Sequence, residues 1–312
     1  MVLKVGIVLI GKILHSSISF LNQINWLLFS VKDAIQYCTI ILGETKKFEV
    51  IGDHTLKIKP LPPVLDPWNV LLTITSNKQL MAIQTSRKKC LVYENRDWFF
   101  HSNIPGQLMP EMVCSLPIGT YVMSFLEVHF LEKDSTKWDT RKWEKLDDFG
   151  LPIWIEFGLP LSNHEMIILR DMTGFQKVLE KLNLDTMMIE PFVKLKTPRY
   201  VPAICVFNGN LFVTGGFSED RNKLVSTEII SLSDLNAKQE ADLNVPRAYH
   251  SMAIVQLKSG MPKLIVFGGD EDDARVEEWD EKEKKWKFSK LTAFQSNISH
   301  RYCYNPSIEL SK

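Results

Sequence analysis

Two stretches, LFVTGG (211–216) and LIVFGG (264–269), decide the fold of this chain. In each, a run of apolar and β-branched residues typical of a strand ends in a pair of glycines. Each stretch also follows a Pro-Arg step, Pro198-Arg199 in one case and Pro246-Arg247 in the other. The glycine pairs are 53 residues apart and the arginines 48. A self-match near fifty residues predicts stacked supersecondary units.

A second mark, a large apolar residue that closes a short turn, extends this period to the rest of the chain. WDEKEKKW (279–286) places Trp286 seven residues after Trp279. Weaker copies of this pattern occur earlier in the chain. The residues that end the turn in each copy are Phe48, Trp98, Trp143, Ile189 and Trp286. Their steps are 50, 45, 46 and 97, and the last step is two periods. The pattern therefore predicts six units of about 48 residues.

Each unit has the pattern of short strands separated by turns. In the second unit the expected strands are 69–76, 79–85, 88–95 and 97–102. A hairpin is expected over 203–216, around Asn208-Gly209-Asn210. QKVLEKLNL (176–184) has a helical pattern but falls where a third strand is required. Residues 13–36 are longer than any equivalent loop, so we expect an insertion there, with helical character.

Four-stranded units of this length stack radially, because each small twisted sheet buries its two faces only against its neighbours. The sequence therefore predicts an all-β, six-bladed β-propeller of four-stranded antiparallel blades, as a single domain over 1–312. Residues 4–11 match the second strand of a unit, and 299–310 match the start of one. We expect the C-terminal tail to supply the missing strand and complete the N-terminal blade, since an open ring leaves unpaired edges. The expected blades are 4–59 with 299–310, 60–104, 108–150, 151–196, 197–245 and 246–296.

The glycine pairs, the aromatic-Asp turn before a tryptophan and the Pro-Arg step together resemble the kelch repeat. The resemblance is specific over 196–292, weaker over 60–195, where glycine pairs are missing, and rests on position alone over 1–59. It implies a six-bladed propeller. Paired glycines allow positive φ, and the aromatic residues supply apolar area between blades. The residues expected to play such structural roles are Gly215, Gly216, Gly268, Gly269, Trp98, Trp143, Trp279 and Trp286.

Composition excludes several classes of function. Lys and Arg number 37 and Asp and Glu also 37, so there is no basic excess to favour nucleic acid. No apolar stretch approaches the roughly eighteen residues that span a bilayer. Five scattered cysteines without a CxxC motif predict neither a zinc site nor a disulfide framework. Free thiols in a reducing compartment are expected, and hence a cytoplasmic protein, although a secreted origin stays open.

No catalytic residue, cofactor or metal is expected. The chain has no GxSxG, HExxH or GxxxxGK[ST] motif. Kelch repeats resemble the propeller of galactose oxidase, so a copper enzyme is the enzymatic alternative to consider. Its copper site needs two His and two Tyr. His250 and His300 fall at the starts of units, without a second convergent His in register. His250 is expected in the core or along a channel. The acidic run 270–273 lacks the alternating spacing of a calcium loop.

The leading hypothesis is a non-enzymatic scaffold, a monomeric ring whose inter-strand loops hold a protein or peptide partner. Many kelch propellers are ubiquitin-ligase adaptors preceded by a helical BTB-BACK region, which we do not expect here because the propeller pattern starts at residue 4. An extracellular or cell-surface kelch-type propeller and a degenerate galactose-oxidase-like enzyme remain the alternatives. A lost or mis-assembled N-terminal portion is also left open. Arg199 and Arg247 are expected either to bind carbonyls of the neighbouring blade or to face a partner. The candidate partner-binding residues are Arg199, Glu219, Asp220, Arg221, Arg247, Asp270, Asp272 and Arg275.

Overall fold

The computed structural model describes fifteen stretches of the chain. They are residues 24–31, 34–41, 44–51, 55–60, 70–77, 79–95, 97–106, 110–124, 127–143, 155–170, 176–239, 241–255, 262–269, 275–290 and 300–304. Every regular element in these stretches is a β-strand, so the all-β prediction is confirmed. The described part holds no helix, and thus none with the length and apolar character needed to cross a membrane.

The described strands form six sheets, each built from four consecutive strands, and β25 adds a fifth strand to the N-terminal sheet. Five sheets have four antiparallel strands, and the N-terminal sheet has five, in the order β25-β1-β2-β3-β4. The N-terminal sheet contains β1 (Ile24–Val31), β2 (Ala34–Ile41), β3 (Glu44–Ile51), β4 (Thr55–Pro60) and β25 (His300–Tyr304). The second contains β5 (Val70–Ile74), β6 (Leu80–Gln84), β7 (Lys89–Glu94) and β8 (Asp97–Asn103). The third contains β9 (Pro110–Leu116), β10 (Gly119–Ser124), β11 (Glu127–Glu132) and β12 (Trp138–Lys142).

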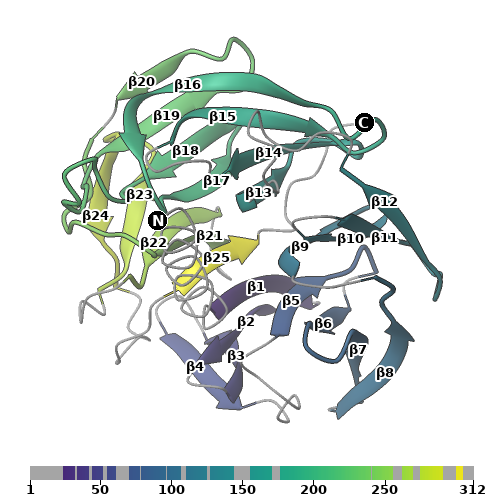
Figure 1. Cartoon of the computed structure of the whole chain (residues 1–312). Helices are drawn as coiled ribbons and strands as arrows, with labels where there is room; N and C mark the ends of the chain where they lie inside the picture. Colours follow the sequence, from purple (N-terminus) through teal and green to yellow (C-terminus); the bar gives the residue numbers. More distant parts are fainter. Residues whose placement is uncertain are drawn as a thin grey trace, which may run out of the picture.

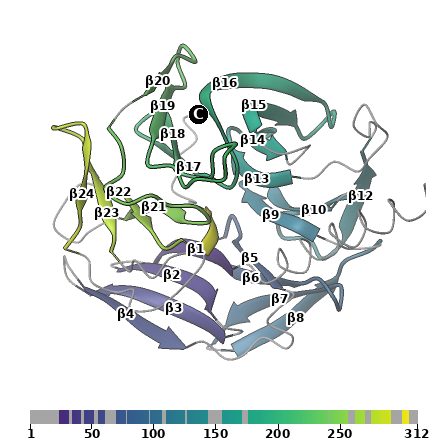
Figure 2. The same ribbon diagram turned by 60° about the vertical axis from the view of Figure 1, so that its left-hand side comes forward.

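The remaining three sheets repeat the same up-and-down order. The fourth contains β13 (Ile155–Pro160), β14 (Glu165–Arg170), β15 (Gln176–Asn183) and β16 (Ile189–Arg199). The fifth contains β17 (Ala203–Phe207), β18 (Asn210–Thr214), β19 (Thr227–Ser231) and β20 (Ala237–Gln239). The sixth contains β21 (Ser251–Val255), β22 (Lys263–Phe267), β23 (Glu277–Asp280) and β24 (Lys285–Phe288). Figures 1 and 2 show the sheets following one another in chain order around a common centre, with the first strands inside.

The core lies between successive sheets. In β14, Met166 and Ile168 pack with the third sheet, whereas Ile167 and Leu169 pack with the fifth. Side chains of a strand alternate between its two faces, so one strand serves two hydrophobic clusters. Both faces of the inner strands are therefore buried, which explains why EMIILR (165–170) is an almost continuous apolar run.

Two difficult strand predictions are confirmed. Residues 176–183 form β15 despite their helical pattern, because tertiary pairing with β14 overrides local propensity. The hairpin of β17 and β18 turns on Asn208 and Gly209, whose φ angles are 50° and 71°. Positive φ at both central residues is the mark of the type I′ turn that Asn-Gly favours.

The N-terminal sheet corrects three predictions. Residues 24–31 and 34–41 are strands β1 and β2, so the expected helical insertion over 13–36 is wrong for its described part. Phe48 lies in the third strand, β3, and not in a closing strand. The tail strand β25 does join this sheet, but as a fifth strand parallel to β1, because β1–β4 already make four. The expected strand over 4–11 lies outside the described residues.

Candidate partner-binding loops

The predicted recognition loops follow the second strands of the last two sheets. Because β17 and β18 are antiparallel, the segment that enters β17 and the loop after β18 lie at the same end of the sheet. The same holds for β21 and β22. The two Pro-Arg steps and both loops therefore belong to one end of these sheets.

The loop after β18 presents three charged side chains to solvent. Glu219, Asp220 and Arg221 are all exposed. The turn that carries them is closed through Ser218, whose N–H donates to the Asn222 carbonyl at 2.9 Å and whose carbonyl accepts the Arg221 N–H at 2.8 Å. The loop thus combines an exposed polar tip with a hydrogen-bonded base.

Inner segments of the fold hold this base in place. Phe217 and Tyr200 exchange two backbone hydrogen bonds of 2.8 and 3.0 Å. The ring of Phe217 packs edge-on against that of Tyr249, with centroids 5.6 Å apart. The Gly216 N–H donates to the Arg247 carbonyl at 2.8 Å. The loop after β18 is therefore joined to the segments that enter both β17 and β21.

Arg199 lies beneath the loop and is 0% exposed. One terminal nitrogen, Nη1, donates to the carbonyls of Gly215 at 2.9 Å and Ser226 at 3.0 Å. The other, Nη2, donates to the Glu228 carboxylate at 2.7 Å. Burial lowers the pKa of the guanidinium, and the charge of Glu228 opposes that shift. The guanidinium thus fastens both ends of the loop that separates β18 from β19.

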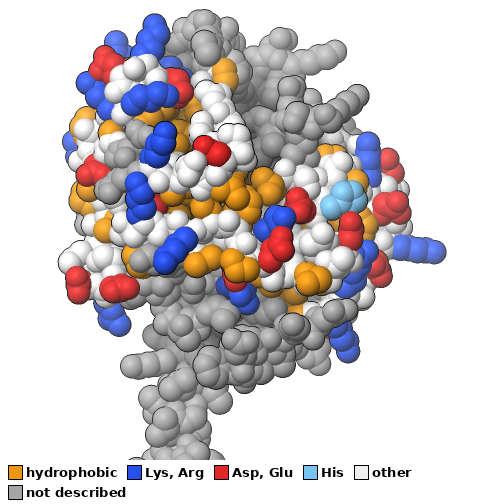
Figure 3. All heavy atoms as spheres, turned by 90° about the horizontal axis from the view of Figure 1, so that it is seen from above, with side chains coloured by type: hydrophobic (Ala, Val, Ile, Leu, Met, Phe, Trp, Pro, Cys, Tyr) orange, Lys and Arg blue, Asp and Glu red, His pale blue; other side chains and the backbone are white. Residues whose placement is uncertain are grey.

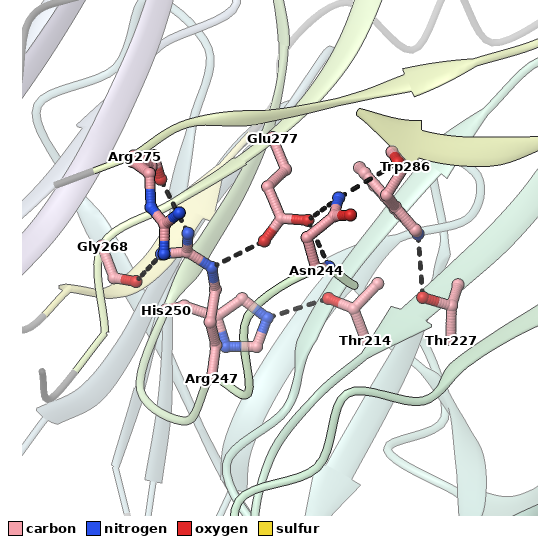
Figure 4. A network of polar contacts seen from close by, with 9 residues as sticks. All are labelled: Thr214, Thr227, Asn244, Arg247, His250, Gly268, Arg275, Glu277 and Trp286. Atoms are coloured by element: carbon pink, nitrogen blue, oxygen red, sulfur yellow. Dashed lines mark hydrogen bonds and ion pairs between the residues drawn. The ribbon is translucent and has the colours of Figure 1, made fainter. Parts of the chain in front are cut away.

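Arg247 repeats this arrangement in the sixth sheet (Figure 4). It donates to the carbonyls of Gly268 and Arg275, both at 2.7 Å, and from Nε to Glu277 at 3.2 Å. The buried Glu277 carboxylate also accepts the backbone N–H of Asn244 at 2.6 Å and its side-chain amide at 2.8 Å. Both guanidinium groups therefore act as internal braces of a loop.

These contacts favour the structural interpretation of the two arginines over a direct partner contact. Arg199 ends β16 of the fourth sheet, and the carbonyls that it binds border β18 and β19 of the neighbouring fifth sheet, as expected. Arg247 instead binds carbonyls of the sixth sheet, whose first strand it precedes, so for this arginine the expected bond to a neighbouring blade is not found. Sequence reasoning missed the partners Glu228 and Glu277. The signal was present, since Arg199 to Glu228 is 29 residues and Arg247 to Glu277 is 30.

The glycine pairs have the conformation that the sequence predicts. Gly215 and Gly216 have φ angles of 57° and 90°, and Gly268 and Gly269 of 72° and 130°. At Gly215 an added Cβ would lie 2.4 Å from the Arg247 carbonyl oxygen. This position therefore needs glycine for its backbone angle and for the close approach of a neighbouring segment.

His250 is buried in the core, and its Cε1 would lie 2.7 Å from a Cβ added at Gly215. Figure 4 shows its ring directed toward Thr214. Its Nε2 is 2.8 Å from the Thr214 hydroxyl, and its Nδ1 has no hydrogen-bond partner. Burial, then the charges of Arg247 and Arg199, hold its pKa well below the usual value. The sequence places His250 either in the core or along a channel, and a buried, neutral imidazole agrees with the core.

The tryptophans expected between blades do pack there in the last two sheets. Trp279 and Trp286 are buried against Phe212 of β18, in the hydrophobic cluster between the fifth and sixth sheets. The Trp286 indole N–H also donates to the Thr227 hydroxyl at 2.9 Å, across that boundary. Trp143 is buried between the third and fourth sheets. Trp98 is only partly buried and contacts Tyr93 of its own sheet.

The other candidate residues lie near the loop after β22. Arg275 is exposed, and its guanidinium lies 4.4 Å from the centroid of the Phe288 ring. Asp270 and Asp272 lie outside the described residues. On the face seen in Figure 3, acidic and basic side chains are interspersed without a large area of one sign. Among the described residues, no three His, Cys, Asp or Glu side chains are grouped to hold a metal ion.

Comparisons with known proteins give the fold and no more. No family model and no curated protein matches the chain. Among solved structures 605 chains match. One is the structure of YjhT, with a TM-score of 0.55 and 9% identity over 86% of this chain and 97% of that one. At this identity the likeness concerns the fold alone. Together with the four-stranded antiparallel sheets, it is consistent with a β-propeller.

Proposed function

We propose that this chain is a kelch-type, six-bladed β-propeller that serves as a non-enzymatic platform for a protein or peptide partner. The contacts between inner strands support the ring. First strands touch in series, β1 with β5, β5 with β9, β9 with β13, and β17 with β21. The tail strand β25 pairs with β1 and also contacts β21. In this proposal β25 joins the last blade to the first.

The observation that supports a binding platform is a loop whose tip is charged and exposed while its two ends are hydrogen-bonded to a buried arginine. Glu219, Asp220 and Arg221 project from a loop whose ends are fastened by the Arg199 guanidinium. A loop held before binding loses little conformational entropy when a partner docks. Rigid scaffolds with polar loops are common recognition surfaces. The proposed partner therefore carries charged groups of both signs, to match two acids and one base.

Panning a random-peptide phage library on the full-length chain tests this proposal. Peptides enriched on the wild type should be lost when Glu219, Asp220 and Arg221 are changed to Ala together. The control changes Lys282, Glu283 and Lys284 to Ala together. They are also three exposed charges in a tight turn, but at the opposite end of the sixth sheet. Equal enrichment on both triple variants, or none on the wild type, would reject the loop after β18 as the binding site.

We also propose that the protein resides in the cytoplasm. The described cysteine side chains, those of Cys90, Cys114 and Cys205, are buried thiols that form no disulfide. Thiol titration of the denatured, unreduced protein should find all five cysteines free. Disulfides between blades would instead favour the extracellular alternative.

A further inference from the structure

The chain contains a single Asn-Gly step, Asn208-Gly209, at the turn between β17 and β18. Both residues are exposed. The Asn208 carboxamide forms no hydrogen bond with any described residue, and the Gly209 N–H donates to none of them. The amide carbon of a side chain and the backbone nitrogen of the next residue are therefore neighbours, and no hydrogen bond to the described part of the chain restrains either group.

The described surroundings leave the Gly209 nitrogen unshielded. Glycine has no Cβ of its own, and one added at this position would meet no atom within 4 Å. Asparagine is a thermolabile residue in proteins. Its amide is lost when the nitrogen of the following residue attacks the side-chain carbon and closes a five-membered ring, a reaction that a bulky following side chain slows. Glycine is thus the following residue that hinders the reaction least.

Ring closure also requires one backbone angle of Asn208. The ring contains the Cα–C bond, so it fixes ψ at about −120°, which is the ψ of the first central residue in a type II′ turn. Asn208 has a φ of 50°, and types I′ and II′ share positive φ at this position. Turning over the peptide between Asn208 and Gly209 converts one type into the other. Among the described hydrogen bonds, this breaks the one of 3.0 Å from the Asn210 side-chain amide to the Asn208 carbonyl. The ring can therefore close without a change in strand register.

We propose that Asn208 is a site of spontaneous deamidation. The Gly209 N–H loses its proton to hydroxide, and the nitrogen forms a bond with Cγ of Asn208. The bond from Cγ to Nδ2 then breaks, and ammonia leaves with a proton taken from water. Water opens the resulting succinimide at either of its carbonyls, which gives aspartate or isoaspartate. The whole reaction consumes one water and releases one ammonia, so it needs no oxidant or reductant.

The two products affect the hairpin differently. Aspartate suits the turn, because Asp-Gly also favours type I′. Isoaspartate adds a methylene group to the main chain of the turn, beside the Gly209 carbonyl that accepts the Leu232 N–H at 3.1 Å. Either product adds a negative charge at the end of the fifth sheet opposite the loop after β18, because β17 and β18 are antiparallel. The proposed partner-binding loop therefore keeps its own charges.

Ageing of the folded, full-length chain at mildly alkaline pH, followed by mass spectrometry of its peptides, tests the proposal. Asn95 is the internal control, because it is also exposed, has a φ of 47° and follows β7 directly. Arg96 follows it in the sequence in place of glycine. The Asn208 peptide should convert to its deamidated forms while the Asn95 peptide keeps its mass. Equal conversion of the two residues, or none at Asn208 in the folded chain, would overturn the proposal.

The variant Asn208→Gly tests the origin of the isoaspartate. Gly-Gly also favours the type I′ turn, so the hairpin should form without the reactive amide. The aged wild type should accept methyl groups from a labelled donor in the presence of an isoaspartyl methyltransferase, and aged Asn208→Gly should accept no more than fresh protein. The rate in the wild type should also rise in proportion to hydroxide concentration, because the Gly209 N–H must lose its proton. Equal methylation of the two aged proteins, or a rate independent of pH, would refute attack by the Gly209 nitrogen.

Discussion

Glu277→Ala is the sharpest perturbation of the brace beneath the sixth sheet. The carboxylate accepts hydrogen bonds from Arg247 Nε, from the Asn244 backbone and from the Asn244 side chain, at 3.2, 2.6 and 2.8 Å. Its removal leaves a buried guanidinium without its counter-ion. Breaking a buried ion pair from one side costs about 3–5 kcal/mol. We expect a loss of that size in the free energy of unfolding, measured by urea titration followed by tryptophan fluorescence.

The neighbouring residue provides the control. Glu278 is the next residue of β23, and its carboxylate contacts Lys263 at 2.8 Å and the Ser289 hydroxyl at 2.7 Å. Both ionic partners are partly exposed. Such surface pairs contribute about 0–1 kcal/mol, so Glu278→Ala should shift the urea midpoint little. If the two alanine variants lose the same free energy, the buried charge at Glu277 does not brace the loop and our reasoning fails.

Further predictions concern the core between the fifth and sixth sheets, the turns and the thiols. Trp286→Ala should destabilise the protein by about 3–5 kcal/mol in the same titration, and an unchanged midpoint would contradict its place between the sheets. Gly215→Ala should cost clearly more than Gly209→Ala, because both have positive φ but only Gly215 has a backbone oxygen 2.4 Å from the new Cβ. The pKa of His250 is depressed from 6.5, so its neutral form stabilises the fold above that pH. Stability should then fall as the pH drops below 6.5, by up to about 1.4 kcal/mol per unit, and His250→Gln should flatten the slope. Burial raises the pKa of Cys90 to about 12, so this thiol should react with iodoacetamide only after unfolding, which mass spectrometry of labelled peptides can follow.

The last two units were easiest to predict because their signals are local. An Asn-Gly step requires a tight turn whatever surrounds it, and residues 203–214 form the expected hairpin. A glycine pair after an apolar run likewise indicates a strand that ends in positive φ, as at Gly215 and Gly268. These features depend on backbone sterics of a few residues. The sequence therefore contains enough information to place them.

The N-terminal sheet could not be placed in the same way. Its strands lack glycine pairs and Pro-Arg steps, so only apolar periodicity remained as a guide. INWLLFSV (24–31) is a short apolar run, which periodicity alone cannot assign to helix or strand. It became β1 because it pairs with β2 on one side and β25 on the other. The partner β25 is more than 260 residues away in sequence, and no local rule reports such a contact.

The glutamates that pair with Arg199 and Arg247 could not be identified from the sequence, and β23 shows why. Glu277 and Glu278 are adjacent acidic residues on one strand, yet one is buried against Arg247 and the other contacts Lys263 near the surface. Composition cannot distinguish them, because the strand decides which carboxylate faces inward. A slip of one residue in β23 would expose Glu277 and bury Glu278. The Arg–Glu pair would then be lost, and a guanidinium would stay buried without its counter-ion. We infer that the repeated pair contributes chiefly by selecting one register for the third strand, since replacing a buried ion pair with apolar residues is often neutral for stability.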